Sequence, residues 1–384
     1  MMTASNPTSA AHAQPRPSRR HAGFTLIELM VALAIGLFLI TVVGSLYVAS
    51  RSIFFATNSA TSMDENARAA FDAIGNSVRN ARYRGCENIS GTITGDVRAD
   101  AYRDPANWWQ NINQPVYGYQ DLTANDPRFD VPTTVSTHGG TVDGTDALIL
   151  IGVDLKREAT VSASTTAAPT PPATTSTSVT LTTTLKHSYG PGQILIGSDC
   201  ATTAYFVADG NTNGDASQIG YSATGGYDCS IDLAVASCGG ATVATPHTFQ
   251  AGALVLPVVA EGYFIAASAS DAANKGNSLW LTTTDPALGG SSSALTPVEL
   301  VNGIENMYIE YGVASGGAIT YSTANAVPDW SSISALKVHL LLATLPDART
   351  SSVGSNAITF KGATFTPTDK RIYREYIQVF SLRN

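Results

Sequence analysis

The chain has little charge and no recognisable catalytic pattern. Only 14% of its 384 residues are Asp, Glu, Lys or Arg. It lacks H-E-x-x-H, a P-loop, a dinucleotide-binding glycine pattern and a G-x-S-x-G elbow, so nothing supports a zinc protease, a nucleotide-binding enzyme or an α/β-hydrolase. Its histidines are scattered, at His12, His21, His138, His187, His247 and His339. The sequence predicts no catalytic residue, no cofactor and no enzymatic activity.

Charge is absent altogether between Leu29 and Ser50. An apolar run of this length can cross a bilayer, because about 20 helical residues at a rise of 1.5 Å span the hydrocarbon core. We therefore expect residues 24–50 to form a transmembrane helix.

Proline is absent from residue 24 to residue 82, so the helix can continue into water. Beyond the apolar run, large or small apolar side chains recur at spacings of three and four, which is the pattern of one helix face. They are Met63, Ala67, Phe71, Ile74 and Val78. We expect an amphipathic second half of the helix over residues 51–85, with Gly85 as its stop.

The apolar run begins with a carboxylate. Its first residues are Gly23-Phe24-Thr25-Leu26-Ile27-Glu28-Leu29-Met30. A charged side chain inside a membrane helix costs roughly 2.5–3.5 kcal/mol on insertion scales. A helix that served only as a membrane anchor would gain nothing from a residue that makes insertion less favourable. We therefore expect Glu28 to have a role inside the bilayer.

This run resembles the class III signal of type IV pilins and pseudopilins. In that family a prepilin peptidase cuts after the glycine, and the new N-terminal residue is methylated. The resemblance implies that residues 1–23 are a cleaved cytoplasmic leader, that cleavage falls between Gly23 and Phe24, and that Phe24 is N-methylated. Glu28 becomes the fifth residue of the mature chain. The nearest cation is then the amine of Phe24, from the same chain or a neighbour, and a buried ionic pair of this kind sets register.

The leader also predicts orientation. Arg19 and Arg20 directly precede the apolar run, which favours a cytoplasmic N-terminus and a head in the periplasm of a Gram-negative cell. Without the leader, 19 basic residues face 30 acidic ones, a formal net charge of −11. This balance disfavours binding to nucleic acid phosphates.

Cysteine is scarce. The four cysteines are Cys86, Cys200, Cys229 and Cys238, without a C-x-x-C or a neighbouring histidine pair, which argues against zinc. An even count in an oxidising compartment predicts two disulfides, with three possible pairings. We favour Cys229–Cys238, which closes a short loop rich in small residues, and Cys86–Cys200.

After Cys86 the helical period is lost. Short strand-like runs bounded by turn residues follow, at 147–153, 178–185, 193–196, 204–207, 254–267, 278–283, 299–313, 335–345 and 373–382. We expect a pilin-like α+β fold, in which the long N-terminal helix packs on a large antiparallel β-rich head over residues 86–384. Residues 159–178, rich in Thr, Ala, Ser and Pro, are predicted to form a low-complexity loop.

Three late segments narrow the resemblance. Residues 300–307 read LVNGIENM, residues 333–345 form a long apolar run, and residues 369–376 are basic and aromatic. Together they are similar to the PilW-type minor pilins of type IV pilus assembly. That resemblance implies a minor pilin that primes or caps the pilus, in contact with other minor pilins, the major pilin, the prepilin peptidase, the inner-membrane assembly platform and inner-membrane lipid, and that serves twitching motility.

Two alternatives stay open from the sequence. A J-type minor pseudopilin of type II secretion shares the long helix and the large β-rich head. A membrane-anchored periplasmic binding or adhesin domain is the alternative of another class.

One loop has a weak metal signature. Asp209, Asn211, Asn213 and Asp215 follow the opening of a calcium loop, with oxygen ligands at alternate positions. The twelfth position is Gly220 instead of a bidentate glutamate. A polar hairpin explains the loop without metal, so the main interpretation includes no metal and keeps calcium as a weak candidate.

Overall fold

The computed structural model divides the chain into two compact units, Met1–Phe54 and Phe55–Asn384. We describe each unit by itself. The described residues are 23, 25–83, 96–99, 107–112, 114–124, 126–129, 140–166, 178–209, 216–222, 233, 247–270, 276–288, 295–344, 357–369 and 371–382.

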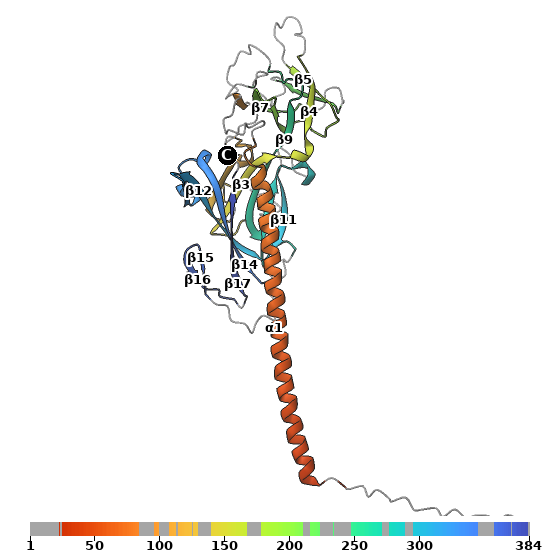
Figure 1. Cartoon of the computed structure of the whole chain (residues 1–384), viewed down its shortest axis with the longest axis vertical. Helices are drawn as coiled ribbons and strands as arrows, with labels where there is room; N and C mark the ends of the chain where they lie inside the picture. The colour runs from red at the N-terminus through yellow and green to blue at the C-terminus, as the bar shows by residue number, and fades with distance from the viewer. Residues whose placement is uncertain are drawn as a thin grey trace, which may run out of the picture. The chain divides into compact units, whose positions relative to one another are not determined.

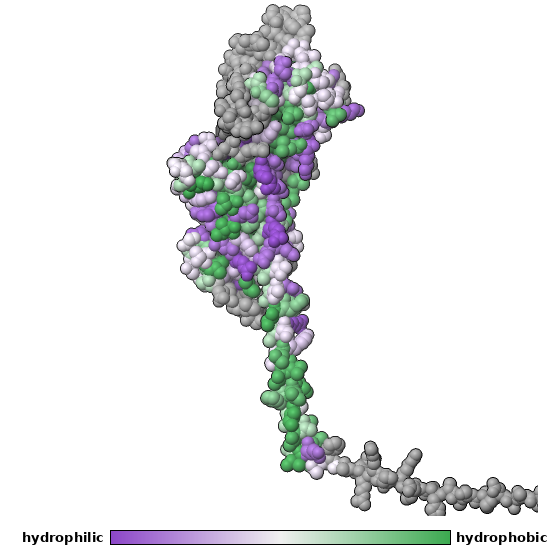
Figure 2. All heavy atoms as spheres, viewed as in Figure 1, coloured by the Kyte–Doolittle hydropathy of each residue, from purple (hydrophilic) through white to green (hydrophobic). Residues whose placement is uncertain are grey.

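The one long helix is α1, Leu26–Asn80 (Figure 1). In the N-terminal unit its large apolar side chains are exposed, including Leu26, Leu37 and Phe38. Figure 2 shows this stretch as almost uniformly hydrophobic. The helix is long and apolar enough to cross a membrane. Exposed leucine and phenylalanine along a whole helix are the pattern of a membrane anchor, not of a soluble core helix.

Strands dominate the second unit, and almost all of their pairings are antiparallel. The described strands are β1 (Asp96–Ala99), β2 (Val116–Leu122), β3 (Thr145–Val153), β4 (Ala159–Thr166), β5 (Ser178–Thr183), β6 (Ile194–Ser198), β7 (Thr202–Val207), β8 (Gln218–Ser222), β9 (Leu254–Ala267), β10 (Asn277–Thr283), β11 (Thr296–Asn302), β12 (Ile304–Ser315), β13 (Ala318–Ser322), β14 (Ile333–Ala343), β15 (Ile358–Phe360), β16 (Ala363–Phe365) and β17 (Tyr373–Ser381).

The larger sheet is organised around β9. The N-terminal half of β9 pairs with β6 and β4, and its C-terminal half pairs with β3 and β10. Strands β7 and β1 extend the sheet beyond β6, β5 and β8 extend it beyond β4, and β2 and β11 pair with β3 and β10. A second sheet has the order β13-β12-β14-β17. The helix and these sheets confirm the expected α+β pilin-like fold.

The amphipathic half of α1 lies in the core between the two sheets. Its predicted stripe is buried, from Met63 at 4% exposure to Ile74 at 0%. It packs on apolar residues of both sheets, including Leu148, Ile265, Leu279, Met307, Leu340 and Phe380. The Asn66 amide donates to Asn302 O of β11 at 3.1 Å, and Arg374 of β17 reaches Asp64 at 3.2 Å. The helix therefore contacts an edge strand of each sheet, which limits strand addition there.

The end of α1 differs from the prediction. The helix stops at Asn80, and Arg82 follows in the left-handed region with φ 62°, whereas Gly85 lies outside the described residues. The cause is the sheet: Ala81 forms an antiparallel bridge to Gly152, and the Arg82 guanidinium donates to Ile333 O and Trp330 O, both at 2.6 Å. Tertiary pairing ends the helix before its sequence signal does.

Two strand predictions need correction. The run 299–313 was predicted as one strand, but it breaks at Gly303, which has φ +76°. β11 before it pairs with β10, and β12 after it pairs with β14. The predicted loop 159–178 begins with strand β4, because its β-branched residues pair with β5 and bury Val161. Residues 167–177 lie outside the described residues.

Candidate functional site

The predicted processing and assembly residues lie at the start of α1. Gly23 and Glu28 are exposed, and Phe24 lies outside the described residues. Thr25 directly precedes the first helical residue, and its Oγ1 accepts a hydrogen bond from Glu28 N at 3.3 Å. Thr25 is therefore the N-cap, in a Thr-x-x-Glu arrangement typical of helix starts.

The cap fixes where Glu28 stands. A carboxylate in the first turn is favoured by the positive end of the helix dipole. Within the described part of the chain, the Glu28 carboxylate takes part in no ion pair. The start of the helix thus presents an exposed acid without a cation of its own. The sequence pattern T-x-x-E, Thr25 to Glu28, could have predicted this cap. We predicted a role for Glu28 and missed Thr25.

Of the four cysteines in the disulfide prediction, only Cys200 lies among the described residues. Cys200 is disulfide-bonded and has φ 66° in the turn between β6 and β7. Asp199 Oδ1 accepts from Ala201 N and Thr202 N at 3.1 and 2.7 Å, which holds this turn. Cys86, Cys229 and Cys238 lie outside the described residues, so the pairing stays a prediction.

We expect the exported protein to contain no free thiol. Two disulfides consume all four cysteines, and an oxidising periplasm maintains them. Alkylation of the denatured, unreduced protein should add no label, whereas alkylation after reduction should add four. Labelling of all four cysteines before reduction would show that the predicted compartment is wrong.

The calcium loop is described only at its edge. Asp209 Oδ1 is buried without a hydrogen-bond partner, and burial raises the pKa of this carboxyl. Asn211, Asn213 and Asp215 lie outside the described residues. No cluster of three acidic, histidine or cysteine side chains suited to a metal occurs among the residues that the structure covers.

The C-terminal polar residues mostly serve the fold. Glu305 forms an ion pair with Arg371, and its carboxylate accepts a hydrogen bond from Asn277 Nδ2 at 2.9 Å. Arg371 also forms an ion pair with Asp369, with 2.6 Å between Arg371 Nε and Asp369 Oδ2. Both Glu305 and Arg371 are largely buried. Arg371 is thus an internal tie between β12 and the start of β17, whereas Arg374 remains half-exposed at the surface.

The outer face of the second sheet carries a chain of charges. His339 Nδ1 lies 2.8 Å from Glu375 Oε1, and His339 Nε2 lies 3.3 Å from Glu310 Oε2. Lys337 Nζ contacts the same Glu310 oxygen at 2.7 Å. Burial raises the pKa of Glu310, but the Lys337 hydrogen bond and charge outweigh it, so its pKa is lowered. His339 therefore serves as a polar residue on the outer face of strand β14, where its ring contacts two carboxylates.

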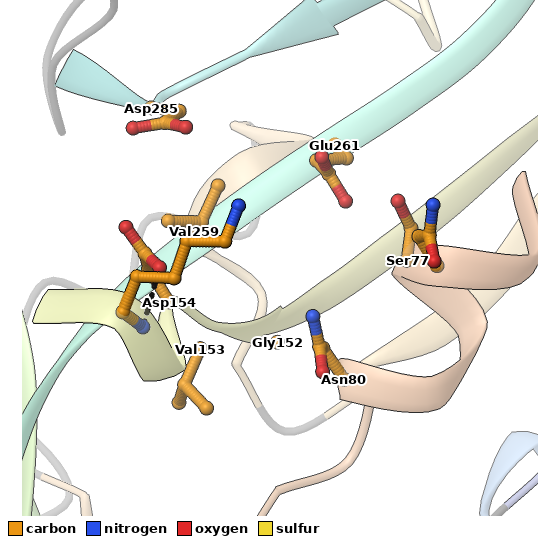
Figure 3. Close-up of a pocket in the computed structure, with 10 residues that line it drawn as sticks. Ser77, Asn80, Gly152, Val153, Asp154, Val259, Glu261 and Asp285 are labelled. Carbon is orange, nitrogen blue, oxygen red and sulfur yellow. Dashed lines mark hydrogen bonds between the residues drawn. The ribbon is translucent and has the colours of Figure 1, made fainter. Parts of the chain in front are cut away.

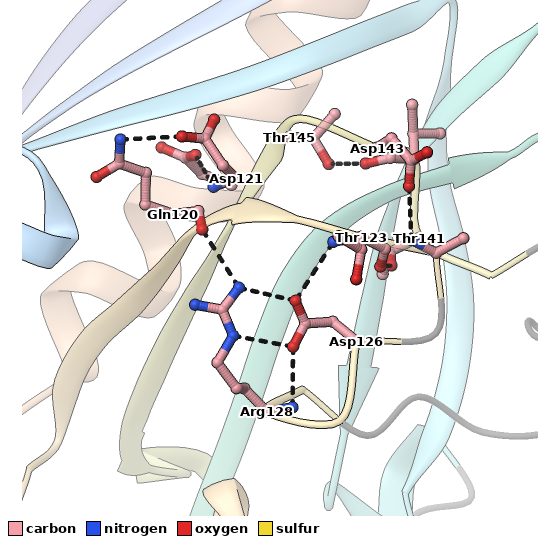
Figure 4. Close-up of polar contacts among 11 residues, drawn as sticks. Gln120, Asp121, Thr123, Asp126, Arg128, Thr141, Asp143 and Thr145 are labelled. Carbon is pink, nitrogen blue, oxygen red and sulfur yellow. Dashed lines mark hydrogen bonds and ion pairs between the residues drawn. The ribbon is translucent and has the colours of Figure 1, made fainter.

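A loop network holds the turn after β2 (Figure 4). Asp126 forms a bidentate ion pair with Arg128, in which Arg128 Nε donates to Oδ1 at 2.9 Å and Arg128 Nη2 donates to Oδ2 at 2.7 Å. The Asp126 carboxylate also accepts a hydrogen bond from Thr123 N. The Arg128 hydrogen bonds keep the pKa of Asp126 far below its usual range. Nearby Asp146 is buried and accepts from Asp121 N and Ile309 N. Its burial still raises its pKa to about 6.

A polar cavity of about 280 Å³ opens where the last turn of α1 meets β3 and β9 (Figure 3). Its lining includes Ser77, Asp154, Lys156, Glu261 and Asp285. Glu261 lies in the wall, and in Figure 3 its carboxylate faces Ser77 across the opening. Withdrawal from water raises the pKa of Glu261 to about 7, and neighbouring Asp285 and Asp154 add to this rise.

The two raised acids predict how head stability depends on pH. In the unfolded chain these carboxyls lose their protons near pH 4, whereas folded Asp146 and Glu261 hold them to about 6 and 7. Stability should therefore fall as pH rises from about 4.5 to about 7, by roughly 3 kcal/mol for each group. Thermal unfolding of the full chain in detergent should give a higher Tm at pH 5 than at pH 7.5. Glu261→Gln should flatten the curve, and an unchanged slope in this variant would contradict the assignment.

Comparison with known proteins gives two family matches. Residues 18–44 match the prokaryotic N-terminal methylation motif, which covers Gly23 and Glu28. Residues 262–384 match the family described as Type IV Pilus-assembly protein W, which covers the second sheet and β10 and β11. No curated protein and no solved structure matches the chain. The methylation motif at the start of the exposed apolar helix and the pilus-assembly match over residues 262–384 together support a PilW-type minor pilin.

Proposed function

We propose that this protein primes assembly of the type IV pilus, or caps it, as part of a minor pilin complex at the inner membrane. One observation carries the proposal: the helix N-terminus presents an exposed Glu28, which the Thr25 cap holds in the first turn and which pairs with no cation among the described residues. A membrane anchor alone needs no such acid, whereas subunit-to-subunit assembly in a bilayer does.

The mechanism follows from the charge of the mature N-terminus. Cleavage after Gly23 leaves an α-amino group on Phe24, which is largely protonated at neutral pH. In hydrocarbon, this amine and the Glu28 carboxylate of an adjacent subunit neutralise each other. The pair fixes the axial register of one helix against the next, which is the best-attested use of a buried ionic pair.

The proposed topology determines the partners. With the arginines of the leader in the cytoplasm, the head lies in the periplasm. There it contacts other minor pilins and the major pilin, while the helix contacts inner-membrane lipid, the prepilin peptidase and the assembly platform. The pilus tip is the final position of a subunit that starts or caps the fibre. The acidic balance of the chain disfavours a nucleic-acid partner.

Sheared surface pili test this function. Quantitative mass spectrometry should find the protein in pili from wild-type cells, in trace amounts relative to the major pilin. A strain that makes no pili provides the control for membrane contamination. Absence from sheared pili, combined with presence in the inner membrane, would contradict a cap that travels with the fibre and leave a priming role to the deletion experiment below.

Processing gives a second expected result. Mass analysis of the N-terminal peptide should show methylated Phe24 as the first residue. Gly23→Val should keep the leader, because the peptidase site accommodates no β-branched side chain at the position before the cut. An intact leader on the wild-type membrane protein would contradict the pilin interpretation.

A further inference from the structure

The cavity beside α1 contains an acid that its surroundings do not neutralise. Arg157 already binds two carboxylates, Asp154 at 2.7 Å and Asp285 at 3.2 Å. Glu261 forms no ion pair with any residue that the structure describes, and the charges that act on it are those of the acids Asp285 and Asp154. Three acids, Asp154, Glu261 and Asp285, thus meet two bases at the cavity, Arg157 and the lining residue Lys156, which leaves one negative charge in excess when Glu261 is ionised.

The hydroxyl group that hydrogen-bonds Glu261 is shared with a second residue. The Ser77 hydroxyl lies 2.6 Å from Tyr263 Oη, and Tyr263 Oη donates to Ala73 O at 3.3 Å. Ser77 is the hydrogen-bonding group that favours the charged form of Glu261. A carboxylate has about four acceptor sites, so one shared hydroxyl leaves most of them free. Above about pH 7, where Glu261 is ionised, its charge costs free energy in the folded head unless a cation arrives.

We propose that this cavity receives a lysine or arginine side chain from a neighbouring subunit of the assembly. The proposal rests on the proposed minor pilin function and adds a head-to-head contact to the helix contact at Glu28. An extended basic side chain can enter a cavity of about 280 Å³ with its charged end first. A metal ion fits less well, because Asp154 and Asp285 are committed to Arg157 and no three-ligand cluster is present among the described residues.

The position of the cavity agrees with this partner. Asn76, Ser77 and Asn80 of the last helical turn form one side, and Gly152, Val153 and Val259 of β3 and β9 form the other. A side chain seated there touches the helix and the larger sheet of the same unit. It would thereby fix the neighbour against the junction of the helix with the larger sheet.

Glu261→Gln tests the proposal, because it removes the charge and keeps the shape. Tagged full-length protein should be solubilised from cells and assayed for co-purified pilin subunits by quantitative mass spectrometry. We expect at least about a tenfold loss of one or more partners, since truncating one member of a buried charge pair is costly. The Tm of the isolated variant at pH 8 should be equal or higher, because an uncompensated charge is gone. Glu158→Gln is the matched control, a neighbouring exposed acid outside the cavity.

Each outcome is decisive. Loss of partners with an unchanged or raised Tm supports the cavity as a partner site. Equal recovery of partners by Glu261→Gln and wild type overturns it. A lowered Tm also overturns it, because Glu261 then has an internal cation such as Lys156. If wild-type protein recovers no pilin at all, the proposed function itself fails, and this result is distinguishable from the other two.

Discussion

Replacing Glu28 by alanine should give a protein that is inserted and processed normally but assembles poorly. Insertion becomes easier, because the cost of a charge in hydrocarbon, roughly 2.5–3.5 kcal/mol, disappears. Assembly becomes harder, because the Phe24 amine of the neighbour loses its partner, and breaking a buried pair from one side costs about 3–5 kcal/mol. We expect at least about a hundredfold loss of co-purified pilins and few surface pili.

The two effects have opposite signs, which makes this substitution informative. Glu65→Ala is the matched control, since it removes an exposed acid of the same helix within the head. Leader removal should be measured on the same samples by N-terminal peptide mass. Wild-type piliation and wild-type co-purification in Glu28→Ala would leave Glu28 without the role assigned to it. Poor insertion or processing would show instead that the acid serves the peptidase.

Gly118→Ala should have the largest effect on folding. Gly118 lies in β2, and a Cβ built there would stand 1.8 Å from Tyr311 Oη and 2.5 Å from Ala147 O. The second contact is to backbone of the paired strand β3, so it cannot relax by a rotamer change. We expect a loss of more than about 4 kcal/mol, among the largest values for single substitutions, and a Tm lower by at least about 5 °C.

The control for Gly118→Ala is Tyr311→Phe, which removes the hydroxyl that the added Cβ would meet. Tyr311 Oη is buried and has no hydrogen-bond partner among the described residues, so removing it should cost nothing or stabilise the head by about 1 kcal/mol. The double variant Gly118→Ala with Tyr311→Phe should recover part of the lost stability, because the clash with Ala147 O remains. Thermal unfolding of the four proteins forms the cycle. Purely additive effects would contradict the contact between these two positions.

The sequence predicts the helix and most strands because their burial follows a simple period. The stripe from Met63 to Val78 is buried as a 3.6-residue pattern requires, and β9 has the predicted bounds of residues 254–267. The processing motif can likewise be recognised in the sequence, because Gly23, Phe24 and Glu28 lie close together along the chain. Local patterns of this kind need no tertiary information.

The remaining features depend on contacts between distant segments. The early end of α1 comes from Arg82 bonding to carbonyls about 250 positions later, at Ile333 and Trp330. The break at Gly303 comes from a change of partner strand, which an uninterrupted apolar alternation conceals. The cavity around Glu261 combines α1, β3 and β9, and no spacing in the sequence brings these elements together. Such long-range juxtapositions become visible only in the folded head.

Deletion of the gene tests the central claim most directly. Surface pili should be counted by electron microscopy in the deletion strain and in the strain complemented with the wild-type gene, and exoprotein secretion should be measured on the same cultures. If the protein is a minor pilin, the deletion strain should lose most surface pili and twitching, and complementation should restore both. Exoprotein secretion should be unchanged. Normal piliation together with a secretion defect would contradict it and identify a pseudopilin of type II secretion.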